Sequence, residues 1–109
     1  MTEEAATADP VIDTFVDALW LEDGLARNTL AAYRRDLNLF AAWLRTRNSQ
    51  LLGATETDVL GYMAARHTGG KATSANRRLT VFKRFYRWAL RERLASSDPT
   101  LKLQPAKQA

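Results

Sequence analysis

The basic residues of the segment 71–93 are the ones best suited to chemistry. This segment holds eight basic residues and a single acid, Glu92. Guanidinium and ammonium groups only donate hydrogen bonds, so they suit phosphate oxygens and the acceptor edges of bases. A solvated protein surface normally mixes both signs of charge, and we therefore favour a nucleic-acid contact over a plain charged face. At 100° per residue, one side of a helix here carries Thr73, Arg77, Thr80, Arg84, Arg87 and Arg91.

The opposite side of the same segment is apolar and predicts a helix packed on a core. The helix is expected to begin at Thr73 or Ser74 and to end near Leu94. Lys71 and the two hydroxyl residues stand at its start, where free backbone N–H groups bind phosphate well. A plain Thr or Ser N-cap explains the same residues, and the two interpretations are compatible. The apolar side consists of Ala75, Leu79, Phe82, Tyr86 and Leu90.

A second helix with a basic start is predicted from Asn28, as N-cap, to about Arg45. Arg34 and Arg35 lie one turn after its start and off its apolar stripe. Two helix N-termini with basic residues beside them suggest two helices that cross a groove. The inward stripe of this helix is Leu30, Tyr33, Leu37, Phe40 and Leu44.

Two further helices are needed to cover these apolar stripes. One starts at Asp9-Pro10 and ends at Gly24, and the other opens with a capping-box pattern at 55–58 and ends at Gly69-Gly70. Leu51 and Leu52 are expected to anchor the loop 46–54. Gly61 inside a helix predicts the close approach of a neighbour. The expected inward residues are Ile12, Phe15, Val16, Leu19 and Trp20 in the first helix, and Val59, Leu60, Tyr62 and Met63 in the third.

The helix pattern predicts an all-α four-helix bundle over residues 9–95. A disordered N-terminus at 1–8 and the start of a linker at 96–109 are expected on either side, with Asp98 capping a turn at Pro99. The 109 residues suit one domain, and no apolar run is long enough to span a bilayer. The acidic, polar start is unlike a secretory signal, so we expect a soluble cytosolic protein.

Metal-dependent or nucleophilic catalysis has little support. The chain has no cysteine and one histidine, His67, which we interpret as a helix-end residue; neither a metal nor a cofactor is expected. The acid pairs Glu22/Asp23 and Glu56/Asp58 fall at helix ends, where capping and the helix dipole explain them.

The charge is unevenly divided along the chain. Residues 1–25 hold seven acids and no Lys or Arg, whereas residues 26–109 hold sixteen bases and five acids. The acidic segment could be kept away from an anionic partner, or it could cover the basic body in the free state. A second open choice concerns apolar residues outside the stripes, which either widen the core or dock a partner: Leu39, Trp43, Val81 and Trp88.

Three runs of sequence point to a known family. The run ALWLEDGLARNTLAAYRRDL, then AAWL, and then KATSANRRLTVFKRFYRWALRER with Asp98-Pro99 resemble the N-terminal core-binding domain of bacterial tyrosine recombinases, over about residues 12–99. The resemblance implies a SAM-like bundle that forms half of a clamp on duplex DNA, with its second and fourth helices across the major groove. The implied DNA contacts are Asn28, Thr29, Arg35, Lys71, Thr73, Ser74, Arg77, Arg84 and Arg87. Arg87 and Arg91 would contact phosphates or the family's C-terminal domain.

The family's chemistry lies outside such a domain. Its tyrosine nucleophile, arginines, lysine and histidines belong to a C-terminal domain, and Tyr33, Tyr62 and Tyr86 do not match the nucleophile motif. The resemblance therefore implies a DNA-binding, monomeric piece without catalysis. Its parent would resolve chromosome dimers with a second, related recombinase and cell-division regulators. An interaction module that docks such a partner is the alternative. A helix-turn-helix repressor is disfavoured, because no short helix pair with a tight turn stands out.

Overall fold

The computed structural model describes residues 9–66 and 72–105, and this part of the chain is helical without strands. It contains the α-helices α2 (Pro10–Ala18), α3 (Arg27–Arg45), α4 (Glu56–Arg66) and α5 (Ala72–Arg91). A π-helical turn, η1 (Leu19–Asp23), extends α2, and a 3₁₀ turn, η2 (Leu51–Gly53), precedes α4. The all-α four-helix prediction is confirmed.

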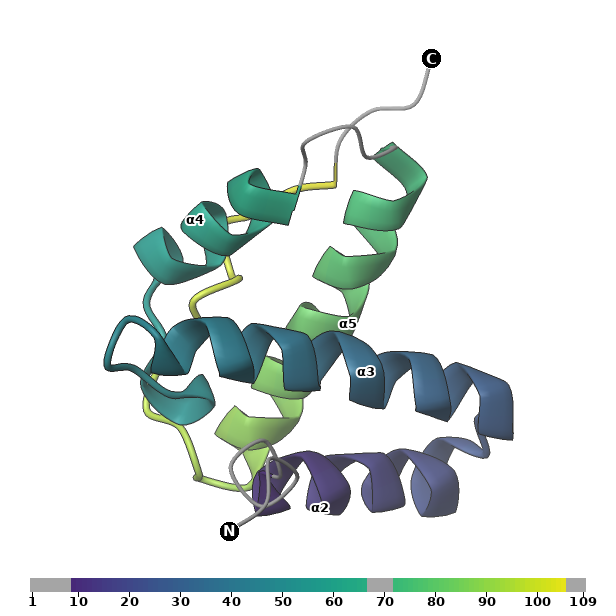
Figure 1. The fold of residues 1–109 in the computed structure, drawn as a ribbon. Helices are drawn as coiled ribbons and strands as arrows, with labels where there is room; N and C mark the ends of the chain where they lie inside the picture. Colours follow the sequence, from purple (N-terminus) through teal and green to yellow (C-terminus); the bar gives the residue numbers. More distant parts are fainter. Residues whose placement is uncertain (1–8, 67–71, 106–109) are drawn as a thin grey trace, which may run out of the picture.

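Helix α3 occupies the centre of the bundle (Figure 1). Helix α2 lies beside it and runs in the opposite direction, while α5 crosses behind it and α4 covers its C-terminal half. In this view α3 begins at the right, whereas α5 begins at the top and runs downward behind α3. The two helices with basic starts are therefore the two that cross.

Three of the predicted helix boundaries are confirmed by hydrogen bonds or backbone angles. The Asp9 carboxylate accepts from the backbone N–H of Val11 at 3.2 Å, and Pro10 is the first helical residue. Gly24 ends the π turn in the left-handed conformation, with φ 63°. Thr55 and Asp58 form the capping box, each side chain accepting from the other's backbone N–H at 3.0 and 3.1 Å.

The prediction of Asn28 as N-cap is wrong. Ala26 is the last extended residue, with ψ 151°, and α3 begins at Arg27 with no side-chain cap. Asn28 therefore lies in the first helical turn, where its exposed side chain does no capping. An exposed helix end can be satisfied by water, which explains how the fold tolerates an uncapped start.

Two linked aromatic clusters form the core. The Phe40 ring stacks on Phe82 with centroids 4.7 Å apart and lies 4.9 Å from Tyr62, joining α3, α5 and α4. Phe15 of α2 meets the edge of Phe85 at 5.3 Å, and aromatic contacts of this kind add to the area buried. Val81, Phe85 and Trp88 are buried, so α5 buries a wide face and these residues are core.

Three residues expected in the core are exposed. Trp20 is 54% exposed because it lies in η1, where the π turn departs from the 100° spacing used for the prediction. Leu60 and Leu90 lie at the edges of the buried faces of α4 and α5 and are 49% and 38% exposed. Val59 and Tyr62 are buried as expected, with Met63 packed partly against the core.

The close approach predicted at Gly61 is confirmed. A Cβ added there would lie 3.3 Å from the Trp43 ring, so α3 reaches α4 through this indole. The loop anchors also agree, with Leu51 buried and Leu52 partly buried. The predicted end of α4 at Gly69-Gly70, and His67, lie outside the described residues.

The segment after α5 packs on the bundle. The Asp98 carboxylate accepts from the backbone N–H of Thr100 at 2.8 Å and from its hydroxyl at 2.6 Å. The Lys83 ammonium donates to the Thr100 carbonyl at 2.5 Å, and Pro99 and Thr100 are buried. Asp98 thus caps a turn as expected, while the linker boundary at 96 stays a prediction.

Two buried tyrosines give a matched stability test. The Tyr86 hydroxyl donates to the Leu51 carbonyl at 2.6 Å, whereas the Tyr62 hydroxyl finds no hydrogen-bond partner among the described residues. Tyr86→Phe should lower the free energy of unfolding by about 0.5–1.5 kcal/mol because it removes one buried hydrogen bond, while the Leu51 carbonyl keeps the bond from the Ala54 N–H at 3.3 Å. Tyr62→Phe should be neutral or stabilising. Urea denaturation of both variants checks this, and equal losses would contradict it.

Burial raises the pKa of both phenols above the usual value of 10. For Tyr86, nearby Asp98 and Asp58 raise the pKa further. A raised pKa means that the folded chain holds the neutral phenol, so this stabilisation is complete below pH 10 and is lost as the pH rises above it. Stability should therefore fall in strong alkali, and less so in Tyr86→Phe.

Candidate nucleic-acid interface

The exposed side of α5 carries the arginine stripe that its sequence predicted. Arg77, Arg87 and Arg91 are exposed, and Arg84 is half-buried at the same side. Ser74 is also half-buried on the first turn. Lys71 lies outside the described residues, as does the side chain of Thr73.

Arg77 is held from behind by a buried carboxylate. Its Nε donates to Asp36 Oδ2 at 3.3 Å and its Nη2 donates to Asp36 Oδ1 at 3.1 Å. The Asp36 side chain is 4% exposed and that of Arg77 is 46% exposed. This bidentate pair joins α3 to α5 at their crossing, and such pairs are both strong and geometrically specific.

Asp36 was not singled out from the sequence, although a signal was present. It lies three residues after Tyr33 and four before Phe40, which places it on the inward stripe of α3. A carboxylate at such a position needs a cationic partner, because burying an unpaired charge is costly. The arginine that supplies it is 41 residues away, and the pairing depends on how the helices cross.

The other end of the stripe meets the acidic end of the first helix. Arg91 donates to Glu22 at 3.1 Å, and Arg84 lies 3.5 Å from the Asp23 carboxylate. The hydrogen bond to Glu22, followed by the one to Glu92, raises the pKa of Arg91. A groove of about 290 Å³ between η1 and α5 is lined by Glu22, Asp23, Arg84, Arg87 and Arg91, among others.

Part of the acidic segment therefore covers part of the basic body. Of the two arrangements left open by the sequence, this contact favours the covering one for Glu22 and Asp23. All of these side chains are about half exposed, so each ion pair is weak and is screened by salt. Arg87 makes no ion pair with a described residue.

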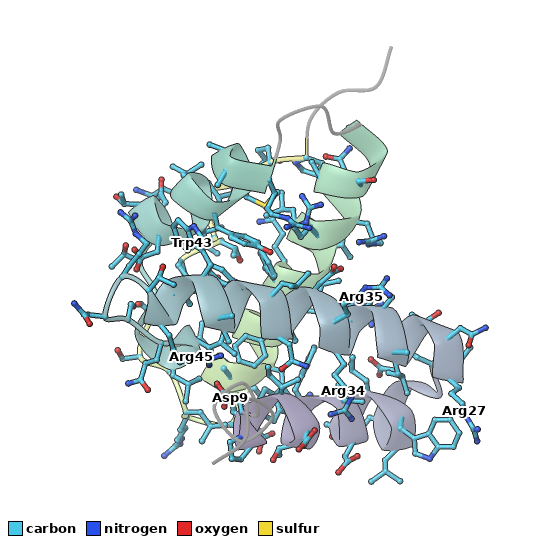
Figure 2. All side chains as sticks on the ribbon, viewed as in Figure 1. Asp9, Arg27, Arg34, Arg35, Trp43 and Arg45 are labelled. Carbon is cyan, nitrogen blue, oxygen red and sulfur yellow. The ribbon has the colours of Figure 1, made fainter. Side chains whose placement is uncertain are left out.

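Helix α3 presents its basic residues on two sides (Figure 2). Arg34 points toward α2, where it pairs with Asp13, while Arg35 points to the opposite side of α3. Arg35 is exposed and makes no ion pair with a described residue. Asn28 is exposed and Thr29 half-buried at the start of the helix. The structure thus separates Arg34 from Arg35, and it joins Arg77 to α3 through Asp36, the residue after Arg35.

The apolar residues proposed for docking are divided between core and surface. Trp43 is half-buried, its ring 5.5 Å from the Tyr62 ring and 4.8 Å below the Arg47 guanidinium. Leu39 is 41% exposed. Trp43 is therefore largely a packing residue, and only Leu39 of this pair stands at the surface.

The part of the chain that the structure describes has no helix long and apolar enough to cross a membrane. Within residues 9–66 and 72–105 there is also no group of three or more acids and histidines placed to hold a metal ion.

Comparisons with known proteins identify the family. Residues 12–93 match the model of the phage integrase N-terminal SAM-like domain. The chain is 61% identical over 97 residues to tyrosine recombinase XerD of Ralstonia nicotianae, covering 89% of this chain and 32% of the relative. It is 46% identical over 100 residues to XerD of Yersinia pestis, covering 91% and 33%, and 48% identical over 95 residues to XerD of Pseudomonas aeruginosa, covering 86% and 32%.

The chain spans about a third of the length of these curated relatives. The matched residues include all of α3, α4 and α5 and most of α2. The SAM-like bundle and the resemblance to tyrosine recombinases are both confirmed: the chain belongs to the phage integrase family and is its N-terminal SAM-like domain.

Proposed function

We propose that this chain is the DNA-binding domain of a XerD-like tyrosine recombinase and forms half of a clamp on duplex DNA. One observation carries the proposal. Helices α3 and α5 together hold ten basic residues and one acid, and that acid, Asp36, is buried against Arg77. The charged side chains that these two helices expose are therefore all basic, although carboxylates of the first helix cover some of them, and such a surface suits a phosphate backbone.

Some of the proposed contacts bind the phosphate backbone and position the domain, and others contact base edges and give sequence specificity. Arg84 and Arg87 bind phosphates, helped by the free N–H groups at the starts of the two helices. Arg77 or Asn28 reads base edges in the major groove. The full set is Asn28, Thr29, Arg35, Lys71, Thr73, Ser74, Arg77, Arg84 and Arg87.

The parent activity is a further part of the proposal. The relatives are named tyrosine recombinases, and the match covers only a third of each. The parent would cut and rejoin DNA through a 3′-phosphotyrosyl intermediate, using residues beyond this domain. It would act in the cytoplasm with a XerC-like recombinase and cell-division regulators to resolve chromosome dimers. The 109-residue chain itself should bind DNA and leave it uncut.

Salt titration tests the central claim. A fluorescent duplex carrying a recombination half-site should bind the chain with an affinity that falls steeply with salt. About five phosphate contacts give a log–log slope near −4.5. Anisotropy at several salt concentrations measures the slope. An absence of binding at every salt concentration would refute the proposal and favour an interaction module that docks a partner protein.

The acidic cover on the stripe predicts a gain of affinity. Glu22→Gln with Asp23→Asn removes the carboxylates of the first helix that contact Arg91 and Arg84, so Arg84 becomes free for phosphate and Arg91 keeps only its pair with Glu92. Affinity for a duplex at low salt should rise by about fivefold, an effect of the size expected for two exposed ion pairs, and the gain should shrink as salt rises.

A matched variant separates this local effect from net charge. Asp17→Asn with Glu56→Gln removes the same charge from exposed positions outside the groove. Its gain in affinity should be smaller. Equal gains in the two double variants would show that Glu22 and Asp23 act only through the overall charge.

A further inference from the structure

The Asp36–Arg77 pair joins two helices and also leaves part of the Arg77 guanidinium without a hydrogen bond to a described residue. A planar guanidinium has five N–H donors arranged along its edges. Asp36 takes one edge, formed by Nε and one N–H of Nη2. The end edge, formed by Nη1 and the second N–H of Nη2, makes no hydrogen bond to a described residue. Two parallel donors thus remain on Arg77, whose side chain is half exposed.

Burial makes this arrangement rigid. The Asp36 side chain is almost fully enclosed, and α3 around it is fixed by the buried Leu37 and Phe40. Arginine side chains at a surface usually lose considerable rotamer freedom on binding. Here the bidentate bond fixes the guanidinium plane beforehand, as a supporting shell does for a functional group.

We propose that Asp36 positions Arg77 so that its free end edge reads a guanine in the major groove. The inference rests on the proposed DNA-binding function and names a specificity determinant within it. Two parallel N–H donors match the O6 and N7 acceptors of guanine. Asp36 itself is a positioning residue, because its carboxylate is turned toward Arg77 and lies below the surface.

Phosphate is the other acceptor that such an edge fits, and the charges favour the base. The Asp36 carboxylate offsets the charge of Arg77, which weakens its Coulomb attraction to a phosphate. It leaves the direction and spacing of the two donors unchanged. A neutral base edge is recognised by that geometry. An arginine whose charge is offset but whose donors are oriented therefore suits a base contact better than a phosphate contact.

The test is selection from a duplex pool with random sequence, using the 109-residue chain, Asp36→Asn and Arg77→Lys. The wild-type chain should enrich a guanine at one position. Asp36→Asn removes one of the two acceptors, and Arg77→Lys keeps the charge without the parallel donors. Both should reduce the guanine preference by about tenfold or more, within the range of a good bidentate contact.

The affinity for unselected duplex provides the second readout. Asp36→Asn adds one net positive charge, so this affinity should hold or rise while the guanine preference falls. That opposite movement distinguishes positioning from a structural role, which would lower both together. Arg66→Lys on the exposed surface of α4 is the matched control and should leave both quantities unchanged. Circular dichroism verifies that each variant is folded. If Asp36→Asn is unfolded, the guanine preference of Arg77→Lys alone tests the proposal.

The outcomes separate the two proposals. If folded Asp36→Asn and Arg77→Lys keep the full guanine preference, the proposed role of the pair is wrong. If the wild-type chain binds duplex without any base preference, that role is also wrong, but the DNA-binding function stands. A uniform loss of affinity in Arg77→Lys, with the base preference intact, assigns Arg77 to a phosphate and also overturns that role. A wild-type chain that binds no duplex refutes the proposed function and this inference with it.

Discussion

Replacing Arg84 and Arg87 together by alanine should weaken duplex binding at low salt by at least about tenfold. The two guanidinium groups lie one turn apart on α5, beside the groove that η1 closes. Removing one phosphate-binding arginine takes away a charge-assisted hydrogen bond and about one counterion-release step, so the log–log salt slope of the double variant should become shallower by about two. The decrease in affinity should be the same for every DNA sequence, since phosphate contacts carry no base information.

Anisotropy titrations of the double variant measure both quantities. Arg45→Ala with Arg66→Ala is the matched control, because it removes two exposed arginines from positions outside the proposed contact set. Both double variants should keep their folding stability within about 0.5 kcal/mol per substitution, as surface changes usually do. If the control loses as much affinity as the test variant, binding depends on net charge and does not depend on the arginines of α5 in particular.

Arg77→Ala should lower the free energy of unfolding by about 3 kcal/mol. It leaves the buried Asp36 carboxylate without its partner, and breaking a buried ion pair usually costs about 3–5 kcal/mol. We take the lower end because the Arg77 side chain is half exposed and water can reach part of the site. Chemical denaturation of the wild type and the variant gives the difference directly.

Removing the charge of Asp36 as well should recover much of this stability. Asp36→Asn combined with Arg77→Ala has no orphaned carboxylate, so the double variant should be more stable than Arg77→Ala alone. A double variant that is less stable than Arg77→Ala would mean that Asp36 is stabilised by something other than the ion pair. Since Arg77→Ala disturbs the fold, a loss of DNA binding in that variant alone does not identify a contact.

Most helices and their buried faces could be predicted from the sequence, whereas the contacts between side chains of different helices could not. The stripes of α3 and α5, the Asp9 cap and the Thr55/Asp58 capping box depend on neighbours one turn apart along a helix, and the structure confirms them except for the exposed Leu90. Trp20 was misplaced because its position depends on a π turn, which a fixed helical period does not anticipate. Asn28 was misplaced because α3 starts one residue earlier without a cap.

The candidate site divides in the same way. The side of α5 that carries Arg77, Arg84 and Arg87 follows from helical spacing alone. The partners of these arginines do not, since Asp36 and Asp23 lie 41 and 61 residues away along the chain. Such contacts depend on the angles at which helices cross, which local patterns do not specify. The partners nevertheless decide what each arginine is free to bind.

The π turn at Leu19–Asp23 has a consequence of its own. A π turn closes its hydrogen bond one residue later than an α turn, so it behaves like a single-residue insertion. If the same five residues formed an ordinary α turn, those at its end would be rotated by up to about 100° around the helix axis. Glu22 and Asp23 would then swing off the side that faces α5, with no change in their own chemistry. The width of this one turn, independently of its composition, thus sets which cations are screened.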